Sequence, residues 1–104
     1  MKAETTSRVS IRNPSSHPLL VIFEPWADEY TVPPGTVYVF EAASPLPGWL
    51  GVEHDGEGII VTAWDSCVGR VYDAAGQLLD SLDIRVPDFT TPAASRDKDP
   101  GAAV

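Results

Sequence analysis

Basic residues are scarce in this sequence: 15 Asp and Glu residues stand against only 7 Lys and Arg residues, which gives a formal net charge of -8. Nucleic-acid affinity depends on Lys and Arg side chains that displace counterions from phosphates, and anionic membranes have the same requirement. The composition therefore argues against both as partners. The acidity itself indicates solubility rather than a particular function.

Cysteine and long apolar runs are also scarce. Cys67 is the single cysteine, so no internal disulfide can form, and its place within a predicted strand indicates a small buried thiol. The longest apolar run, LLVIF at 19–23, is far too short to span a membrane. The N-terminal residues lack the apolar stretch of a signal peptide, so a soluble, cytoplasmic protein is expected.

Patterns typical of catalysis or metal binding are missing as well. The sequence has no Gly-x-Ser-x-Gly elbow and no P-loop, and its two histidines, His17 and His54, accompany no nucleophile motif. Cys67 is followed by VGRVYD, without the nearby His and Met that a blue-copper site would use. Asp55 and Glu57 supply too few oxygen ligands for Ca²⁺. We therefore expect no enzyme activity, no cofactor and no metal.

What the sequence does contain is an alternation of apolar and polar residues with period two, interrupted by frequent turn signals. No segment has a sustained helical period, so the pattern predicts an all-β protein. About seven strands are typical of a small antiparallel β-sandwich of immunoglobulin-like or related Greek-key topology. The strands are expected at 7–13, 17–24, 36–42, 49–54, 59–64, 67–73 and 77–86.

The chain divides into one domain and two tails. Residues 1–7 are polar and without period, and residues 88–104 are rich in Pro, Ala, Asp and Lys, with Phe89 as their only aromatic residue. We expect a flexible N-terminal tail and a disordered C-terminal tail, because neither offers much apolar surface to bury. Residues 8–87 then form the β-sandwich domain, and 104 residues leave room for one modest core.

The segment EPWADEYTVPPG at 24–35 places carboxylates and aromatics directly before a Pro-Pro-Gly turn. Pro25 cannot donate a hydrogen bond to a sheet, so it should end the preceding strand and start an arch that crosses between the two sheets. Gly35 fits the left-handed position of a type II turn after Pro34. We expect Trp26 and Tyr30 to plug one open end of the core.

The alternative interpretation of the same segment is a recognition patch on a loop, to which an exposed Trp49 would add a further aromatic. The candidate binding residues share a carboxylate or aromatic side chain near a strand end, and they are Glu24, Trp26, Asp28, Glu29, Tyr30 and Trp49. The function expected from these features is a small non-enzymatic binding or accessory module. Its protein partner is unknown, and it would be a monomer or a homodimer paired through sheet edges.

Two other functions stay open at this point. A carbohydrate-binding module would present Trp26, Trp49 and Trp64 as a row of flat aromatic surfaces. A hydrolase would use the carboxylates around Trp26 as a general acid and base.

The order of NP, an apolar strand, EPW, EY, a Pro-Gly turn and a later strand ending in Trp resembles a group of short, uncharacterised bacterial β-domain proteins. The resemblance extends over 9–79, and it is strongest in EPW with EY close behind. The matching residues are Asn13, Pro14, Glu24, Pro25, Trp26, Glu29, Tyr30, Pro34, Gly35 and Trp64. It implies a compact β-domain and no particular activity.

Overall fold

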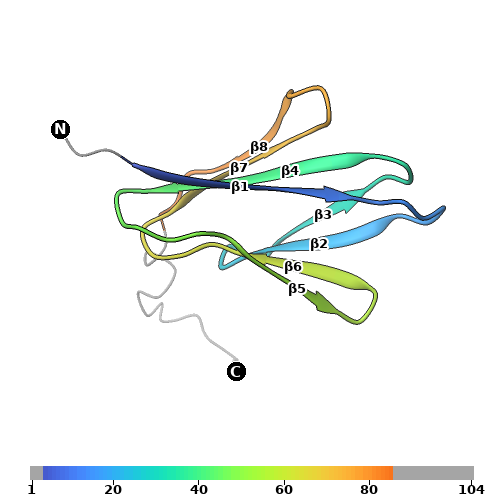
Figure 1. Cartoon of the computed structure of the whole chain (residues 1–104), viewed down its shortest axis with the longest axis horizontal. Coiled ribbons are helices and arrows are strands. Elements are labelled where there is room, and N and C mark those ends of the chain that lie inside the picture. Colours follow the sequence, from blue (N-terminus) through green and yellow to red (C-terminus); the bar gives the residue numbers. More distant parts are fainter. Residues whose placement is uncertain (1–3, 86–104) are drawn as a thin grey trace.

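The computed structural model describes residues 4–85, which contain eight β-strands and no helix (Figure 1). The prediction of an all-β protein is confirmed. The strands are β1 (Thr5–Arg12), β2 (Leu19–Glu24), β3 (Asp28–Val32), β4 (Val37–Ser44), β5 (Gly51–Asp55), β6 (Gly58–Thr62), β7 (Val68–Tyr72) and β8 (Leu78–Leu82). Since these residues include no helix, they include none that is long and apolar enough to cross a bilayer.

The strands form two four-stranded sheets that lie one above the other in Figure 1. Sheet A has the order β1-β4-β7-β8, and sheet B has the order β3-β2-β6-β5. Neighbouring strands of residues 4–85 pair antiparallel except β2 and β6, which run parallel with Phe23 opposite Val61. The expected purely antiparallel arrangement is therefore wrong at this pair. The parallel pairing is possible because the chain passes through β4 of sheet A in between, which supplies the long crossover that parallel neighbours need.

The core lies between the two sheets, where alternate residues of most strands point inward, whereas all five residues of β5 are exposed. Phe23 of β2 meets Phe40 of β4 edge-on, with the ring centroids 5.4 Å apart. Other fully buried apolar residues are Val21, Val32, Ala42, Val61, Cys67 and Val71. Cys67 is the buried thiol that the sequence predicts, and burial raises its pKa. Among residues 4–85 no third layer covers the outer face of either sheet.

The segment 24–30, which the sequence analysis interprets as a crossing between sheets, forms a hairpin within sheet B instead. β2 ends at Glu24, the Glu24–Pro25 peptide bond is cis, and residues 25–27 turn the chain into β3 with Ala27 at a φ of 62°. Pro25 does end the strand. Pro25 and the carboxylates predict an arch here rather than an eighth strand, although the run Tyr30–Val32 is rich in residues that favour strands.

The Pro-Pro-Gly turn that follows β3 makes one of the crossings between the sheets. The amide of Thr36 donates to the carbonyl oxygen of Pro33 at 3.2 Å, and Gly35 has a φ of 71°. The predicted type II turn is therefore confirmed. It carries the chain from β3 in sheet B to β4 in sheet A.

Asn13 connects this crossing to the end of β1. Its side chain is buried, and its amide group donates to the carbonyl oxygens of His17 and Val32 at 2.7 and 2.9 Å. The side-chain oxygen accepts from the backbone N–H of Ser15 at 3.0 Å, and the backbone N–H of Asn13 donates to Thr36 at 2.9 Å. These bonds satisfy a buried amide that would otherwise destabilise the fold.

β1 begins at Thr5, within the range 1–7 that the sequence analysis assigns to a flexible tail. Thr5 and Ser7 lie opposite Ser44 and Ala42 of β4. The hydroxyl of Ser7 accepts a hydrogen bond from the backbone N–H of Leu50 at 3.0 Å. A polar side chain on this edge strand therefore binds the loop before β5. The strand therefore starts earlier than its polarity suggests. The predicted C-terminal tail at 88–104 lies outside the described residues.

Candidate functional site

Trp26 belongs to the core. Its side chain is only 7% exposed, and its ring meets Phe23 edge-on with the centroids 4.9 Å apart. The indole N–H donates to the carbonyl oxygen of Ile84 at 2.7 Å, which joins the β2–β3 turn to the chain after β8. The backbone of Gly69 approaches the same ring so closely that an added Cβ would lie 3.1 Å from it. This burial is what the plug interpretation predicts.

Tyr30 also points inward, from β3 toward sheet A. Its ring meets Phe40 edge-on with the centroids 5.6 Å apart, and its hydroxyl donates to the carboxylate of Asp80 at 2.8 Å. Burial, followed by the hydrogen bond to Asp80, raises the pKa of Tyr30 well above its ordinary value. Because β3 and β8 are edge strands of different sheets, this bond closes one side of the molecule.

The three carboxylates of the segment do not all lie on one face of sheet B. Asp28 lies opposite the core residue Phe23, whereas its neighbour Glu29 lies opposite Ile22 and points to the outer face of sheet B. Glu24, two residues beyond Ile22 on β2, shares that outer face. Asp28 and Glu29 therefore face opposite sides of the sheet.

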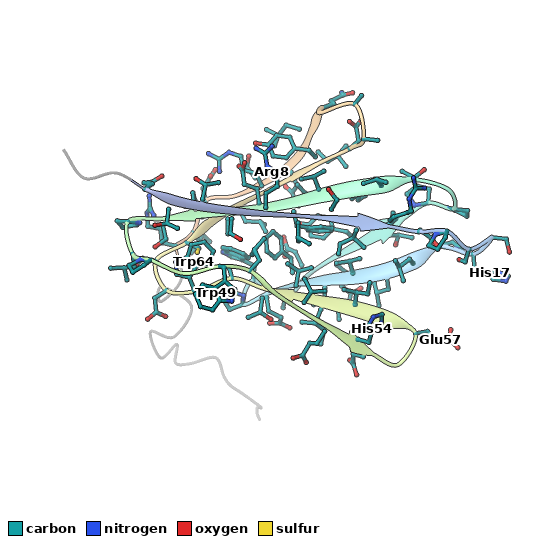
Figure 2. The ribbon with its side chains drawn as sticks, viewed as in Figure 1. Arg8, His17, Trp49, His54, Glu57 and Trp64 are labelled. Atoms are coloured by element: carbon teal, nitrogen blue, oxygen red, sulfur yellow. The ribbon has the colours of Figure 1, made fainter. Side chains whose placement is uncertain are left out.

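Trp49 lies on a separate loop and is 79% exposed, as the sequence predicts. Trp64 lies at the same end of the molecule, whereas His17 and Glu57 lie toward the opposite end (Figure 2). The indole N–H of Trp64 donates to the carbonyl oxygen of Leu46 at 2.9 Å, and a Cβ added at Gly48 would overlap its ring. Trp64 is thus held against the loop that presents Trp49. The six candidate residues do not form one site.

A different surface has the features of a binding site, and it is the outer face of sheet B. Leu20 and Ile22 of β2 and Ile60 of β6 point outward there, because their neighbours Val21, Phe23 and Val61 point into the core. Leu20 is 40% exposed, and the other two are half-buried. They line a hollow of about 330 Å³, which we call the sheet B hollow.

Carboxylates border the sheet B hollow. Asp55 and Glu57, at the end of β5 and in the β5–β6 turn, line its wall. Glu53 of β5 lies opposite Ile60 in the sheet register and therefore shares the same face. Glu29 lies on the β3 side and so flanks the hollow from the opposite edge of the sheet. The site is an apolar floor between two acidic borders, of which the β3 border consists of Glu29 alone.

A second hollow of about 390 Å³ adjoins the first at the start of β2. His17 and His54, which lie far apart in the sequence, both line it, together with Arg12 and Glu57. Among residues 4–85 no group of three or more His, Cys, Asp or Glu side chains is placed to hold a metal ion. The two histidines line an open hollow to which Pro14, Pro18 and Leu19 also contribute.

The sequence contains one signal for the sheet B hollow. The run LLVIF has apolar residues at every position, which is expected when a strand is covered on both faces. In β2 only one face is covered by sheet A, and no second layer of residues 4–85 covers the outward residues Leu20 and Ile22. An unbroken apolar strand at the centre of a two-layer fold could have identified this face.

Comparison of the chain with protein-family models, with curated proteins and with solved structures finds no match. The resemblance based on EPW and EY therefore stays a prediction.

Proposed function

We propose that this domain is a small non-enzymatic module that binds another protein through the outer face of sheet B. The observation that carries the proposal is the apolar floor formed by Leu20, Ile22 and Ile60. A sheet face in contact with water usually carries polar side chains, and a contiguous exposed apolar patch is typical of an interaction surface. A partner that covers this floor would remove its apolar area from water.

The proposal includes the architecture of a β-sandwich related to the immunoglobulin-like or Greek-key folds. Two face-to-face sheets of four strands with a shared core support it. The parallel pairing of β2 with β6 departs from a purely antiparallel sandwich. The proposed similarity to those folds therefore concerns the two packed sheets more than the order in which the strands are connected. Such a scaffold is rigid enough to present one sheet face as a preformed surface.

The non-enzymatic part of the proposal is supported by the arrangement of the carboxylates. Asp28 and Glu29 face opposite sides of sheet B, so a single substrate would not contact both of them. The rival function as a hydrolase around Trp26 needs an acid and a base on either side of one bond. The burial of Trp26 leaves little of its ring for a substrate to contact.

The alternative of a carbohydrate-binding module receives less support than protein binding. It needs several flat aromatic surfaces in a row, but Trp26 is buried and Trp64 is half-buried against Gly48. Trp49 is the only tryptophan of residues 4–85 with a largely exposed ring. One exposed indole fits the rim of a protein interface equally well.

We propose a cytoplasmic monomer that meets its partner as a separate chain. A single buried cysteine suits a reducing compartment, because the fold needs no disulfide. The edge strands of sheet B, β3 and β5, offer the alternative of homodimer formation through strand pairing. Sedimentation at several protein concentrations distinguishes the two states.

The test of the proposed function compares two substitutions of the same kind on opposite outer faces. Ile60→Thr removes part of the sheet B floor, and Val39→Thr makes the matched change on the outer face of sheet A, where Val39 lies opposite Tyr72. Threonine keeps the branched shape that strands favour, so both variants should remain folded. Each is immobilised beside the parent protein, and the proteins retained from an extract of the producing cells are identified.

We expect that a protein from the extract binds to the parent and to Val39→Thr but not to Ile60→Thr. Loss with Val39→Thr alone would assign binding to sheet A. Equal retention by all three proteins would show that the sheet B floor takes no part in binding.

A further inference from the structure

We infer that the sheet B hollow binds an amphipathic helix of a partner protein, whose apolar stripe is flanked on both sides by Lys and Arg. The inference rests on the proposed function, because it names the chemistry of the partner for the same face. Three properties of the face support it: the sign of its charge, the separation of its acidic borders and the length of its strands.

The charge of this face has a single sign. None of the four strands of sheet B contains a lysine or an arginine, whereas Glu29, Glu53 and Asp55 all point outward from them. Glu24 and Glu57 add carboxylates near the two ends of the floor. A partner with basic side chains would therefore meet complementary charge along both borders, and an acidic partner would be repelled.

Of the four arginines of residues 4–85, Arg12 lies near this face, because it lines the adjoining hollow together with Glu57. Arg8 and Arg70 project from the outer face of sheet A, where both lie beside Glu41 in the sheet register. Arg8 forms an ion pair with Glu41, and Arg70 lies 3.8 Å from Asp83. Since these arginines already have acidic partners on their own face, a second copy of this chain is a poor source of the missing positive charge. The net charge of -8 also opposes the approach of a second copy.

The width of the face selects a helix. The acidic borders lie on β3 and β5, which are separated by the two central strands β2 and β6. Three interstrand spacings amount to about 14 Å, and an α-helix with its side chains is about 10–12 Å wide. A helix lying along the central strands would thus cover Leu20, Ile22 and Ile60. Its flanking Lys and Arg side chains would reach the carboxylates on either side.

The length of the face is consistent with the same occupant. A strand of six residues, such as β2, extends over about 20 Å, and a helix of about 13 residues has the same length. This is three to four turns, a common helix length in globular proteins. Helices that lay an apolar stripe into a groove are a recurring mode of peptide recognition.

The experiment measures the binding of three synthetic peptides by fluorescence anisotropy. Each is about 18 residues long, which allows partial helix formation in water. The first has leucines at helical spacing flanked by lysines, the second has glutamates in place of the lysines, and the third contains the residues of the first in an order without helical period. We expect saturable binding of the first peptide alone, and this binding should weaken as salt is added.

Two sets of charge variants with equal net charge then test the acidic border on the β5 side. Glu53→Gln, Asp55→Asn and Glu57→Gln together should weaken binding of the first peptide about tenfold, because each removed pair contributes a few tenths to one kcal/mol. The matched control combines Glu4→Gln, Asp65→Asn and Asp83→Asn, which are exposed carboxylates outside the strands of sheet B. It should leave the affinity within about twofold, since distant exposed charges are screened. Equal weakening by both sets would show attraction by net charge alone and would overturn the inference.

Ile60→Thr separates failure of the inference from failure of the proposed function. The inference is wrong if the glutamate peptide binds, or if the peptide without helical period binds as tightly as the first. If Ile60→Thr abolishes that binding, the face is still a protein-binding site, but its partner is not a basic helix. If the lysine peptide binds and Ile60→Thr leaves its affinity unchanged, binding occurs away from the hollow and both proposals are wrong. If no peptide binds, the inference is overturned, and the extract experiment still decides the proposed function.

Discussion

The hydroxyl of Tyr30 donates a hydrogen bond of 2.8 Å to the carboxylate of Asp80, and this bond joins the edge strand β3 of one sheet to the edge strand β8 of the other. Burial and the Asp80 hydrogen bond raise the pKa of Tyr30 above its usual value of 10.0. A raised pKa in the folded state favours the neutral phenol there. The stability that Tyr30 contributes should therefore be complete below a pH of about 10 and decrease above it, as the unfolded chain ionises.

Tyr30→Phe tests this relationship. We expect the free energy of unfolding to fall by about 1–2 kcal/mol at neutral pH, because the carboxylate of Asp80 loses a donor. The variant should also lose less stability than the parent between pH 9 and about 11, where a tyrosine ionises. Urea denaturation over this pH range measures both effects. Tyr72→Phe is the control, since the Tyr72 hydroxyl makes a longer bond of 3.3 Å to Glu41. Identical pH profiles for Tyr30→Phe and the parent would contradict the argument.

Trp26→Ala should lower the free energy of unfolding by about 3–5 kcal/mol, because it removes a buried ring and leaves a cavity beside Phe23. Trp26→Phe should have a smaller effect, since it keeps an aromatic ring and loses the hydrogen bond to Ile84. Trp49→Ala is the exposed counterpart and should change stability by less than about 0.5 kcal/mol. Thermal unfolding ranks the three variants. A Trp26→Ala protein that melts like the parent would refute the core assignment.

Gly48→Ala should destabilise the fold by about 1–3 kcal/mol, because the new methyl group would overlap the indole of Trp64 and force it to move. Gly51→Ala is a matched control three residues further on, where an added Cβ meets no atom within 4 Å. It should change stability by less than about 0.5 kcal/mol. Urea midpoints compare the two. Equal midpoints would mean that Trp64 does not depend on a glycine at position 48.

Ala27→Gly should leave the free energy of unfolding unchanged or raise it by up to about 1 kcal/mol. Ala27 has a φ of 62°, a conformation that glycine adopts without the strain that a Cβ introduces. The same substitution at Ala74, an exposed residue whose φ is not positive, should destabilise the fold by about 0.5–1 kcal/mol. Calorimetry of the two variants gives the comparison. Destabilisation by Ala27→Gly as large as by Ala74→Gly would contradict it.

The alternation of apolar and polar residues was sufficient to predict the all-β class and the approximate position of seven strands. It succeeded in β1, where Val9 and Ile11 face the core while Arg8 and Arg12 are exposed. It failed in β3, because Pro25 and the adjacent carboxylates suggested a loop, whereas the strand begins at Asp28 directly after a three-residue turn. A local pattern cannot distinguish a crossing from a hairpin when both begin at a proline.

The candidate site was harder to predict because it depends on which strands become neighbours. Leu20 and Ile60 lie on adjacent strands only through the parallel pairing of β2 with β6, and no local pattern specifies a parallel pair across so long a separation. The sequence did indicate that Trp49 is exposed and Cys67 is buried. Those properties follow from the immediate neighbours of each residue, whereas the sheet B hollow follows from the topology.

The strand order divides each sheet between the two halves of the chain. The half before the loop 45–50 supplies β1 and β4 to sheet A and β2 and β3 to sheet B, and the half after it supplies the other four strands. Each half alone would hold only two-stranded ribbons, which are marginally stable in water. The β4–β7 and β2–β6 seams unite the halves, so cutting the chain within this loop should yield two fragments that remain unfolded separately and reconstitute the domain when mixed.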